Sequence, residues 1–276
     1  MRLFKTQRTH RPTFLADGSL DLYAPSAWRQ LSQSQLRYVL TLLSLFEDLA
    51  VVKTYMLFRL CGIHLAGRAV RLRGEWPDAF HCWVRPRWWQ RRRWFTLSSW
   101  QVERLTQQFD FIDPFDSMDV RLERIHGCRA VDDILDHYPF GDYLLAEQYY
   151  QLALMSGKPE MIERLACKLY VRRDGTHPEI LSLSPSEQMG TLRWFSHVKS
   201  VFAERWPHFY HHVDTTLSDG DVDLMGAMDT QIRALTDGDV TKEVAIRQLP
   251  CWRALTELNE KAREAREFRE RCKHHP

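Results

Sequence analysis

The sequence has no long uninterrupted apolar run and no paired-cysteine motif. Its longest apolar stretch, residues 38–60, is broken by four charged side chains, so we predict no transmembrane span. The first ten residues contain no apolar segment of the kind found in secretory signals, and we expect no signal peptide. The six cysteines are scattered without a C-x-x-C pair, which is typical of reduced intracellular thiols. We therefore expect a cytoplasmic or virion-associated protein.

Sequence motifs that mark common enzymes are also missing. The phosphate-binding patterns G-x-x-x-x-G-K-[ST] and G-x-G-x-x-G, the nucleophile pattern G-x-S-x-G and the zinc pattern H-E-x-x-H do not occur. The net charge of only +2 excludes a global attraction to nucleic acid or to an anionic membrane, so any such attraction must come from a local patch. These absences favour a non-enzymatic binding or assembly protein without a cofactor.

Residues 138–172 predict two short helices that fold back on each other. Asp142 is a candidate cap for the first helix. Gly157 suits the left-handed residue that ends a helix, and Pro159 suits the first turn of the next one. Apolar residues then recur at helical spacing at Ile162, Leu165, Ala166, Leu169 and Tyr170. We expect this hairpin to form the core on which the rest of the chain packs.

Three other helices are predicted to begin with a capping box, in which a serine is followed three residues later by Gln or Glu. The serines are Ser32, Ser98 and Ser184. We also expect a helix over roughly 49–61 and a short one near 130–137.

The pattern changes over residues 68–97. Apolar side chains alternate there with polar or basic neighbours at Val70, Leu72, Phe80, Cys82 and Val84, and a further strand is indicated by the run 94–97. Alternation is the two-residue period of a strand. We therefore predict a mainly α protein with a helical-hairpin core, a small inserted β-meander and a long C-terminal helix.

The predicted C-terminal helix begins near Pro250 and carries a narrow apolar stripe. The stripe is followed, past Ala265, by almost only charged residues. Such a helix is expected to project from the body, either solvated or against a partner helix. The polar stretch 214–220 is the expected linker, which gives a domain of residues 1–213 and a C-terminal region of residues 214–276.

The segment 83–95 is unusually rich in tryptophan and arginine. Arginines contact phosphates and aromatic faces stack on bases, as single-stranded nucleic acid requires. Both residue types are also frequent hot spots of protein interfaces. A purely structural alternative places the tryptophans on the core and the arginines in water. The candidate partner-binding residues are Arg85, Arg87, Trp88, Trp89, Arg91, Arg92, Arg93 and Trp94, together with Trp252, Leu255 and Leu258 of the last helix.

Histidine and aspartate clusters offer an alternative, a metal-dependent enzyme, which we do not favour. His208 and His212 have the spacing of two zinc ligands, but Phe209 stands where the zinc-protease motif needs glutamate. Residues 219–223 start like a calcium loop, yet the required glycine and glutamate at its sixth and twelfth positions are absent. We expect no bound metal.

Two regions carry a resemblance to known proteins: the run 140–144 with Glu147, Tyr150 and the pair 169–170, and above all the run 232–264. Across most of residues 25–270 the chain resembles a family of uncharacterised helical proteins encoded in prophage-like gene clusters. The resemblance implies a role in virion assembly, as a tail-assembly-chaperone-like protein or other tail component, with virion proteins or further copies of the chain as partners. It says nothing about the arginine-rich insert, which is not a feature of that family.

Overall fold

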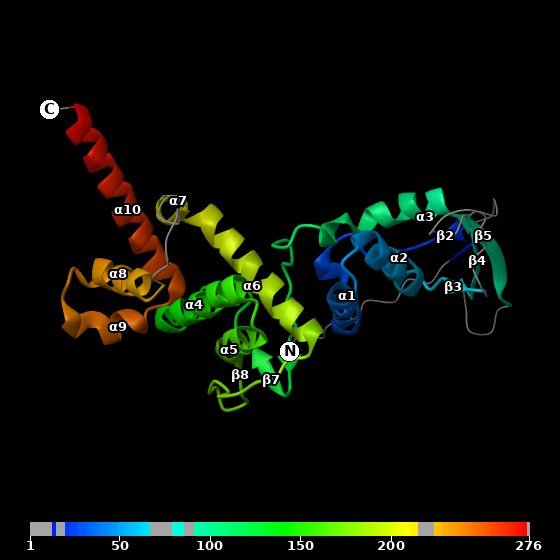
Figure 1. Cartoon of the computed structure of the whole chain (residues 1–276), viewed down its shortest axis with the longest axis horizontal. Helices are drawn as coiled ribbons and strands as arrows, with labels where there is room; N and C mark the ends of the chain where they lie inside the picture. Colours follow the sequence, from blue (N-terminus) through cyan, green and yellow to red (C-terminus); the bar gives the residue numbers. More distant parts are fainter. Residues whose placement is uncertain (1–12, 15–19, 67–78, 86–90, 215–223, 275–276) are drawn as a thin grey trace, which may run out of the picture. The chain divides into compact units, whose positions relative to one another are not determined.

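The computed structural model describes residues 13–14, 20–66, 79–85, 91–214 and 224–274, and it is mainly α-helical, as predicted (Figure 1). The chain divides into two compact units, Met1–Pro114 and Phe115–Pro276. The boundary that we expected at residues 213/214 lies inside the second unit. Among the helices that the structure describes, none has the length and apolar composition needed to cross a membrane.

The first unit combines helices with short strands. Its helical segments are η1 (Trp28–Gln30), α1 (Gln33–Leu45), α2 (Leu49–Leu60), α3 (Ser99–Thr106) and η2 (Gln107–Ile112), and its strands are β1 (Thr13–Phe14), β2 (Leu20–Asp21), β3 (His64–Leu65), β4 (Ala79–Val84) and β5 (Arg93–Ser98).

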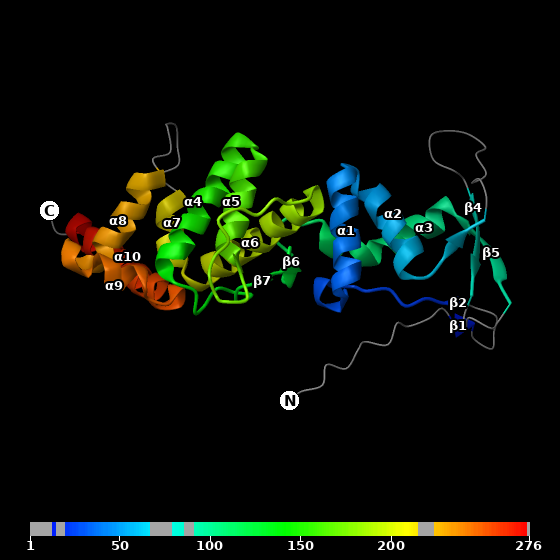
Figure 2. The same ribbon diagram turned by 90° about the horizontal axis from the view of Figure 1, so that it is seen from below.

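The predicted meander is present as an antiparallel sheet with the order β3–β4–β5. Figure 2 shows β4 and β5 side by side. The first strand is the pair His64–Leu65, just before the range that we expected, whereas Val70 and Leu72 lie outside the described residues. The sheet packs on α2, where the rings of Phe58 and Phe80 lie 5.5 Å apart.

Local sequence accounts for how the helices begin. The three predicted capping boxes are confirmed at the starts of α1, α3 and α6. At α1, for example, the Ser32 N–H donates to Gln35 Oε1 at 2.9 Å, which satisfies a backbone donor that the helix itself cannot.

The second unit is built on the predicted hairpin. Its helical segments are α4 (Phe140–Ser156), α5 (Pro159–Leu169), α6 (Pro185–Arg205), α7 (Pro207–Asp214), α8 (Leu224–Thr236), η3 (Val240–Lys242), α9 (Glu243–Arg247) and α10 (Cys251–His274), and its strands are β6 (Arg124–Ile125), β7 (Cys128–Ala130) and β8 (Tyr170–Val171).

The helices α4 and α5 lie side by side, and the residues predicted at their junction have the expected roles. Gly157 ends α4 with φ of 63°, in the left-handed region, and Pro159 occupies the first turn of α5. The predicted cap at Asp142 is wrong, because α4 begins at Phe140 and the Asp142 carboxylate instead pairs with Lys168 Nζ at 3.0 Å.

The short helix expected near residues 130–137 is also wrong. Residues 128–130 form β7, which pairs with β6 and with β8, and turns follow it. The pairing with β8 joins positions some forty residues apart, Arg129 with Val171. A local pattern cannot reveal such a partner.

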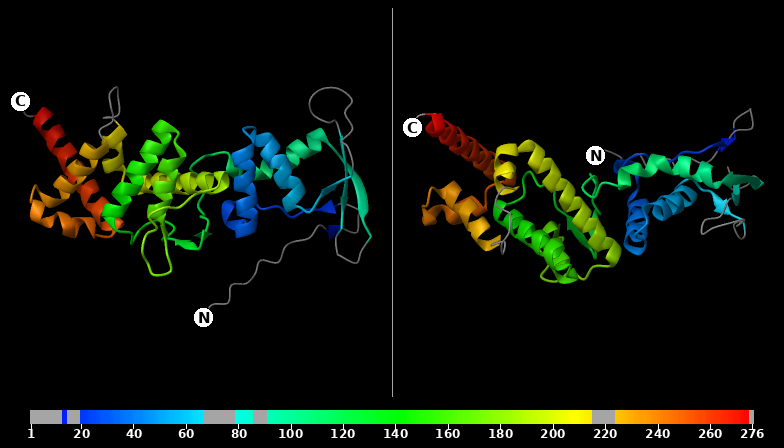
Figure 3. Two further views of the ribbon diagram at one scale, coloured as in Figure 1. Left: turned by 60° about the horizontal axis from the view of Figure 1, so that its bottom comes forward. Right: turned by 45° about the horizontal axis from the view of Figure 1, so that its top comes forward.

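The long C-terminal helix is confirmed as α10, and its two halves have different surroundings. The first half packs on α7 and α8, and its buried Asn259 accepts hydrogen bonds from the backbone N–H groups of His208 and Phe209, at 3.0 and 3.3 Å. The second half is exposed from Glu264 to Cys272 and runs clear of the other helices of this unit (Figures 1 and 3). The first half of α10 therefore packs both on α7, which precedes the expected linker, and on α8, which follows it.

Two pairs of opposite charge stand four residues apart on α10, Glu257 with Lys261 and Arg263 with Glu267, and the second forms an ion pair. Arg263 reaches Glu267 at 2.6 Å, and it also reaches Glu260. Lys261, however, pairs with Asp237 at 2.6 Å rather than with Glu257.

Replacing Gly157 by alanine should lower the free energy of unfolding by about 1 kcal/mol, because a Cβ is disfavoured at positive φ although open space surrounds it. Urea-induced unfolding followed by circular dichroism measures the loss. Gly157→Asn is the control and should cost less, since asparagine tolerates this conformation. Equal stability of Gly157→Ala and the parent chain would contradict the assignment.

Replacing Lys53 by methionine should destabilise the first unit by about 1 kcal/mol. Lys53 Nζ lies 2.6 Å from Asp110 and 2.7 Å from Asp113, and the lysine side chain is only 12% exposed. Burial acts to lower the pKa of Lys53, but hydrogen bonds to the two carboxylates outweigh it and raise the pKa above its ordinary value of 10.5. The stabilisation is therefore complete below pH 10.5 and lost as the pH rises through the higher folded pKa. Unfolding of the two chains at pH 8 and at higher pH checks this; a difference that does not shrink with pH would count against it.

Candidate functional site

The alternation of side chains along β4 gives the β3–β4–β5 sheet two different faces. Phe80, Cys82 and Val84 point inward and are at most 8% exposed. Burial raises the pKa of the Cys82 thiol to about 11, so this thiol is neutral core at physiological pH. His81 and Trp83, between them, must point to the opposite side.

A row of aromatic side chains crosses that opposite side. Trp83 is the direct cross-strand partner of His64 on one flank and of Trp94 on the other. The His64 and Trp83 rings are nearly parallel with centroids 4.0 Å apart, and the Trp83 and Trp94 rings are tilted with centroids 6.5 Å apart. Arg92 Cζ lies 4.4 Å from the Trp83 ring centroid, a cation–π contact. We call this surface the outer face and define it by His64, His81, Trp83, Arg92, Trp94 and Thr96.

The outer face is positively charged at its open end. Arg85, Arg91, Arg92 and Arg93 are all exposed, and the described residues 79–85 and 91–98 contain no Asp or Glu. These positive charges also act on His64. Burial is the largest cause that lowers the pKa of His64, and the positive charges of Arg59, Arg92 and Arg85 lower this pKa further. An anion brought to this face would meet cations without a competing carboxylate from the described part of these strands.

The structure brings only part of the predicted site together. Trp94 is 62% exposed on the outer face, whereas Arg87, Trp88 and Trp89 lie outside the described residues. The expectation that the α10 stripe is open to a partner needs correction, because Leu255 and Leu258 are 0% and 4% exposed. Contacts with α7, α8 and α4 cover this side of α10. Trp252 is half-buried beside Arg253, whose Cζ lies 5.2 Å from its ring.

Four members of the outer face were not among the predicted site residues: His64, His81, Trp83 and Thr96. His64 stands in a two-residue strand, which gives no periodic pattern to detect. Trp83 belongs to the segment 83–95 but was not singled out. Its position between Cys82 and Val84, both buried, is the signal that could have assigned it to the outer face.

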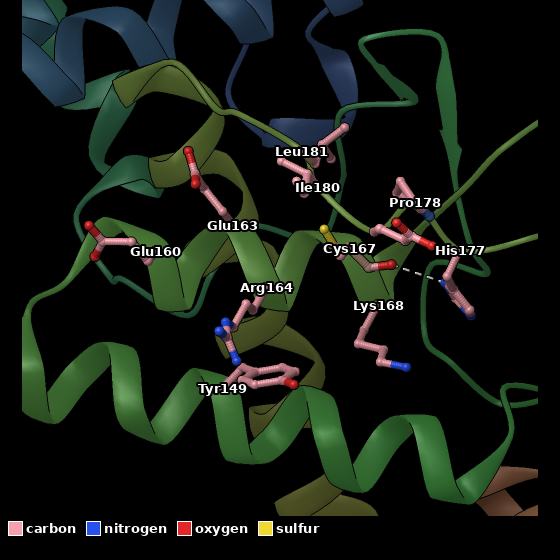
Figure 4. A pocket seen from close by; sticks show the side chains of 11 residues that line it. Tyr149, Glu160, Glu163, Arg164, Cys167, Lys168, His177, Pro178, Ile180 and Leu181 are labelled. Carbon is pink, nitrogen blue, oxygen red and sulfur yellow. Dashed lines mark hydrogen bonds between the residues drawn. The ribbon is translucent and has the colours of Figure 1, made fainter.

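The second unit contains a pocket of about 500 Å³ between α4, α5 and the loop that follows β8 (Figure 4). A histidine and a cysteine both line it. His177 Nδ1 lies 3.1 Å from the Cys167 carbonyl oxygen and 3.3 Å from that of Tyr170. Carbonyl oxygens only accept hydrogen bonds, so Nδ1 carries the hydrogen and fastens the loop to α5.

The Cys167 thiol of this pocket is in its neutral form. Burial raises the pKa of the Cys167 thiol, and the nearby Glu163 raises it further, so the thiol stays protonated at neutral pH. Asp142 Oδ2 lies 3.8 Å from His177 Nε2, while Asp142 Oδ1 pairs with Lys168. Asp142 and Lys168 thus hold α4 to α5, and the Nδ1 contacts of His177 hold the following loop to α5 and β8.

Another pocket, of about 420 Å³, lies among α4, α6, α7 and α8. The hydroxyls of Tyr143 and Tyr210 are 2.8 Å apart, and Glu147 pairs with Lys199. Burial is the main cause that raises the pKa of both tyrosines well above 10. Neither phenol can act as a base at neutral pH.

The histidine cluster gives no support to a metal site. Among the described residues, no group of three His, Cys, Asp or Glu side chains could hold a metal ion. The side chain of His212 and residues 219–223 lie outside the described part, so the proposed pairing of His208 with His212 is not tested.

Comparison with known proteins adds no family to these observations. No protein-family model, no curated protein and no solved structure matches this chain. The resemblance to the prophage-encoded family therefore stays a hypothesis from the sequence.

Replacing Arg92 by glutamine should raise the pKa of His64, because removing a nearby positive charge favours the imidazolium. A pH titration of the His64 ring signals by NMR measures the shift. Arg104→Gln, which removes an exposed arginine on α3, is the control and should leave the pKa of His64 unchanged. No difference between the two variants would contradict the placement of Arg92 beside His64.

Proposed function

We propose that this chain is a non-enzymatic interaction protein, and that the outer face of the β3–β4–β5 sheet is where it holds an anionic partner. The observation that carries the proposal is the row of His64, Trp83 and Trp94 beside exposed arginines, with no carboxylate in the described parts of β4 and β5 and their flanks. Cationic and aromatic side chains on one surface are suited to binding rather than to chemistry.

The ionisable groups of the second unit support the non-enzymatic part of the proposal. The Cys167 thiol and the phenols of Tyr143 and Tyr210 are held neutral by burial. A nucleophile or a general base needs the opposite shift, toward a group that ionises near the working pH.

A narrower role in virion assembly is supported by the sequence resemblance alone. In that case the anionic partner would be a virion protein or another component of the assembling particle. Binding assays with such purified components, in the format described next, would test the narrower role.

The test of the general proposal is binding to a simple polyanion, poly-glutamate or heparin, measured as a function of salt. The parent chain should bind at low salt and release as salt is added. A variant with Arg85, Arg91 and Arg92 changed to alanine should bind at least about tenfold more weakly, because three unscreened charges near the ligand are lost.

The matched control removes three exposed arginines elsewhere, Arg104, Arg172 and Arg173, and so makes the same change in net charge. It should retain binding close to the parent value. If the chain binds neither the polyanions nor an oligonucleotide at low salt, or if both triple variants lose binding equally, the proposal is wrong.

A further inference from the structure

From the outer face we infer a specific class of ligand: single-stranded nucleic acid, with Trp94 as the ring on which a base stacks and the arginines at the open end of the sheet as phosphate contacts. This inference rests on the proposed function and names its partner. It uses only side chains that the structure describes, and residues 86–90 take no part in it.

The two tryptophans of the outer face differ in their contacts and in their exposure to water. Trp83 is already engaged, since His64 lies parallel to it at 4.0 Å and Arg92 lies 4.4 Å from its ring centroid. Trp94 meets Trp83 at a tilt of 55° and is still 62% exposed. An indole held against its neighbour with most of its surface in water is a platform for a planar group from outside, and every base has such a planar face.

The surroundings of Trp94 favour nucleic acid over a protein partner. A protein hot spot is a side chain, often tryptophan or arginine, in a well-packed pocket from which water is excluded, and Lys, Asp and Glu are depleted around it. Here Trp94 lies beside Trp83, its other neighbours on the outer face are His81, Thr96 and Arg92, and His81 Nδ1 lies 3.2 Å from Thr96 Oγ1. A stacking ring among polar and cationic groups matches a base joined to a phosphate.

The size of the face agrees with this choice. Six-residue strands such as β4 and β5 are about 20 Å long, and three strands are about 14 Å wide, which gives roughly 300 Å². A stable protein interface uses about 800 Å² on each partner, so the described face is small for one. A length of about 20 Å corresponds to roughly six stacked nucleotides at about 3.4 Å each, within the site sizes of single-strand binders.

The inference separates the roles of Trp94 and the arginines, and each role has its own signature. Stacking does not involve the counterions of the strand, whereas each phosphate contact releases them. Loss of Trp94 should therefore weaken binding at every salt concentration without changing the salt dependence. Loss of Arg85, Arg91 and Arg92 should reduce the slope of log K against log salt by about 2.

The experiment measures fluorescence anisotropy of the full chain with a labelled oligothymidylate of roughly 12 nucleotides, and with the same strand lacking its bases, over a series of salt concentrations. Trp94→Ala should weaken binding of the strand with bases about tenfold and leave the baseless strand unaffected. A duplex of equal length, whose base faces are covered, should bind more weakly than the single strand.

Trp100→Ala is the matched control, because Trp100 is also 62% exposed but lies on α3, away from the outer face. It should bind like the parent chain. The circular dichroism of both variants should match that of the parent, which shows that both fold.

If strands with and without bases bind equally and Trp94→Ala has no effect, this inference is overturned although the anionic-partner proposal stands. Binding of poly-glutamate tighter than that of the oligonucleotide would assign the face to an acidic protein instead. If the parent chain binds none of these anions, both this inference and the anionic-partner proposal are overturned.

Discussion

The burial of every second side chain of β4 is the constraint on which the candidate site depends. Phe80, Cys82 and Val84 are almost fully inaccessible, and full burial of such a side chain contributes about 1.5–3 kcal/mol. A slip of the register by one residue would expose all three and force Trp83 into the core. The outer face is therefore held in place by the core beneath it, and a substitution on the outer face leaves that core intact.

The second unit uses its polar groups differently. Asp142 joins α4 to Lys168 of α5, His177 fastens the following loop, and Glu147 joins α4 to Lys199 of α6. These contacts satisfy groups whose partial burial would otherwise be costly. Because these polar side chains join one element to another and the thiol of Cys167 and the phenols of Tyr143 and Tyr210 stay neutral, this part of the unit has the character of a scaffold. The candidate binding surface, the outer face, lies in the first unit.

Predictions that depended on neighbouring residues succeeded, and predictions that depended on distant ones failed. The capping boxes and the left-handed Gly157 need only their own turn of the chain, so the sequence contains all that forms them. Asp142 was assigned to a cap because its partner Lys168 is 26 residues away. The local pattern of the segment that begins with β7 predicts a helix for the same reason, because its partner strand β8 is distant in the chain.

The candidate site shows the same division. The amino-acid sequence by itself determined that residues 83–95 are rich in arginine and tryptophan, and that β4 has one apolar side. Only the tertiary structure decided that His64 lies against Trp83, that Arg92 covers the same ring, and that Leu255 and Leu258 are covered by α7, α8 and α4. The physical reason is that the two-residue period of a strand determines which of its side chains lie on the same face. Which other element covers that face depends on packing between segments that are distant in the chain.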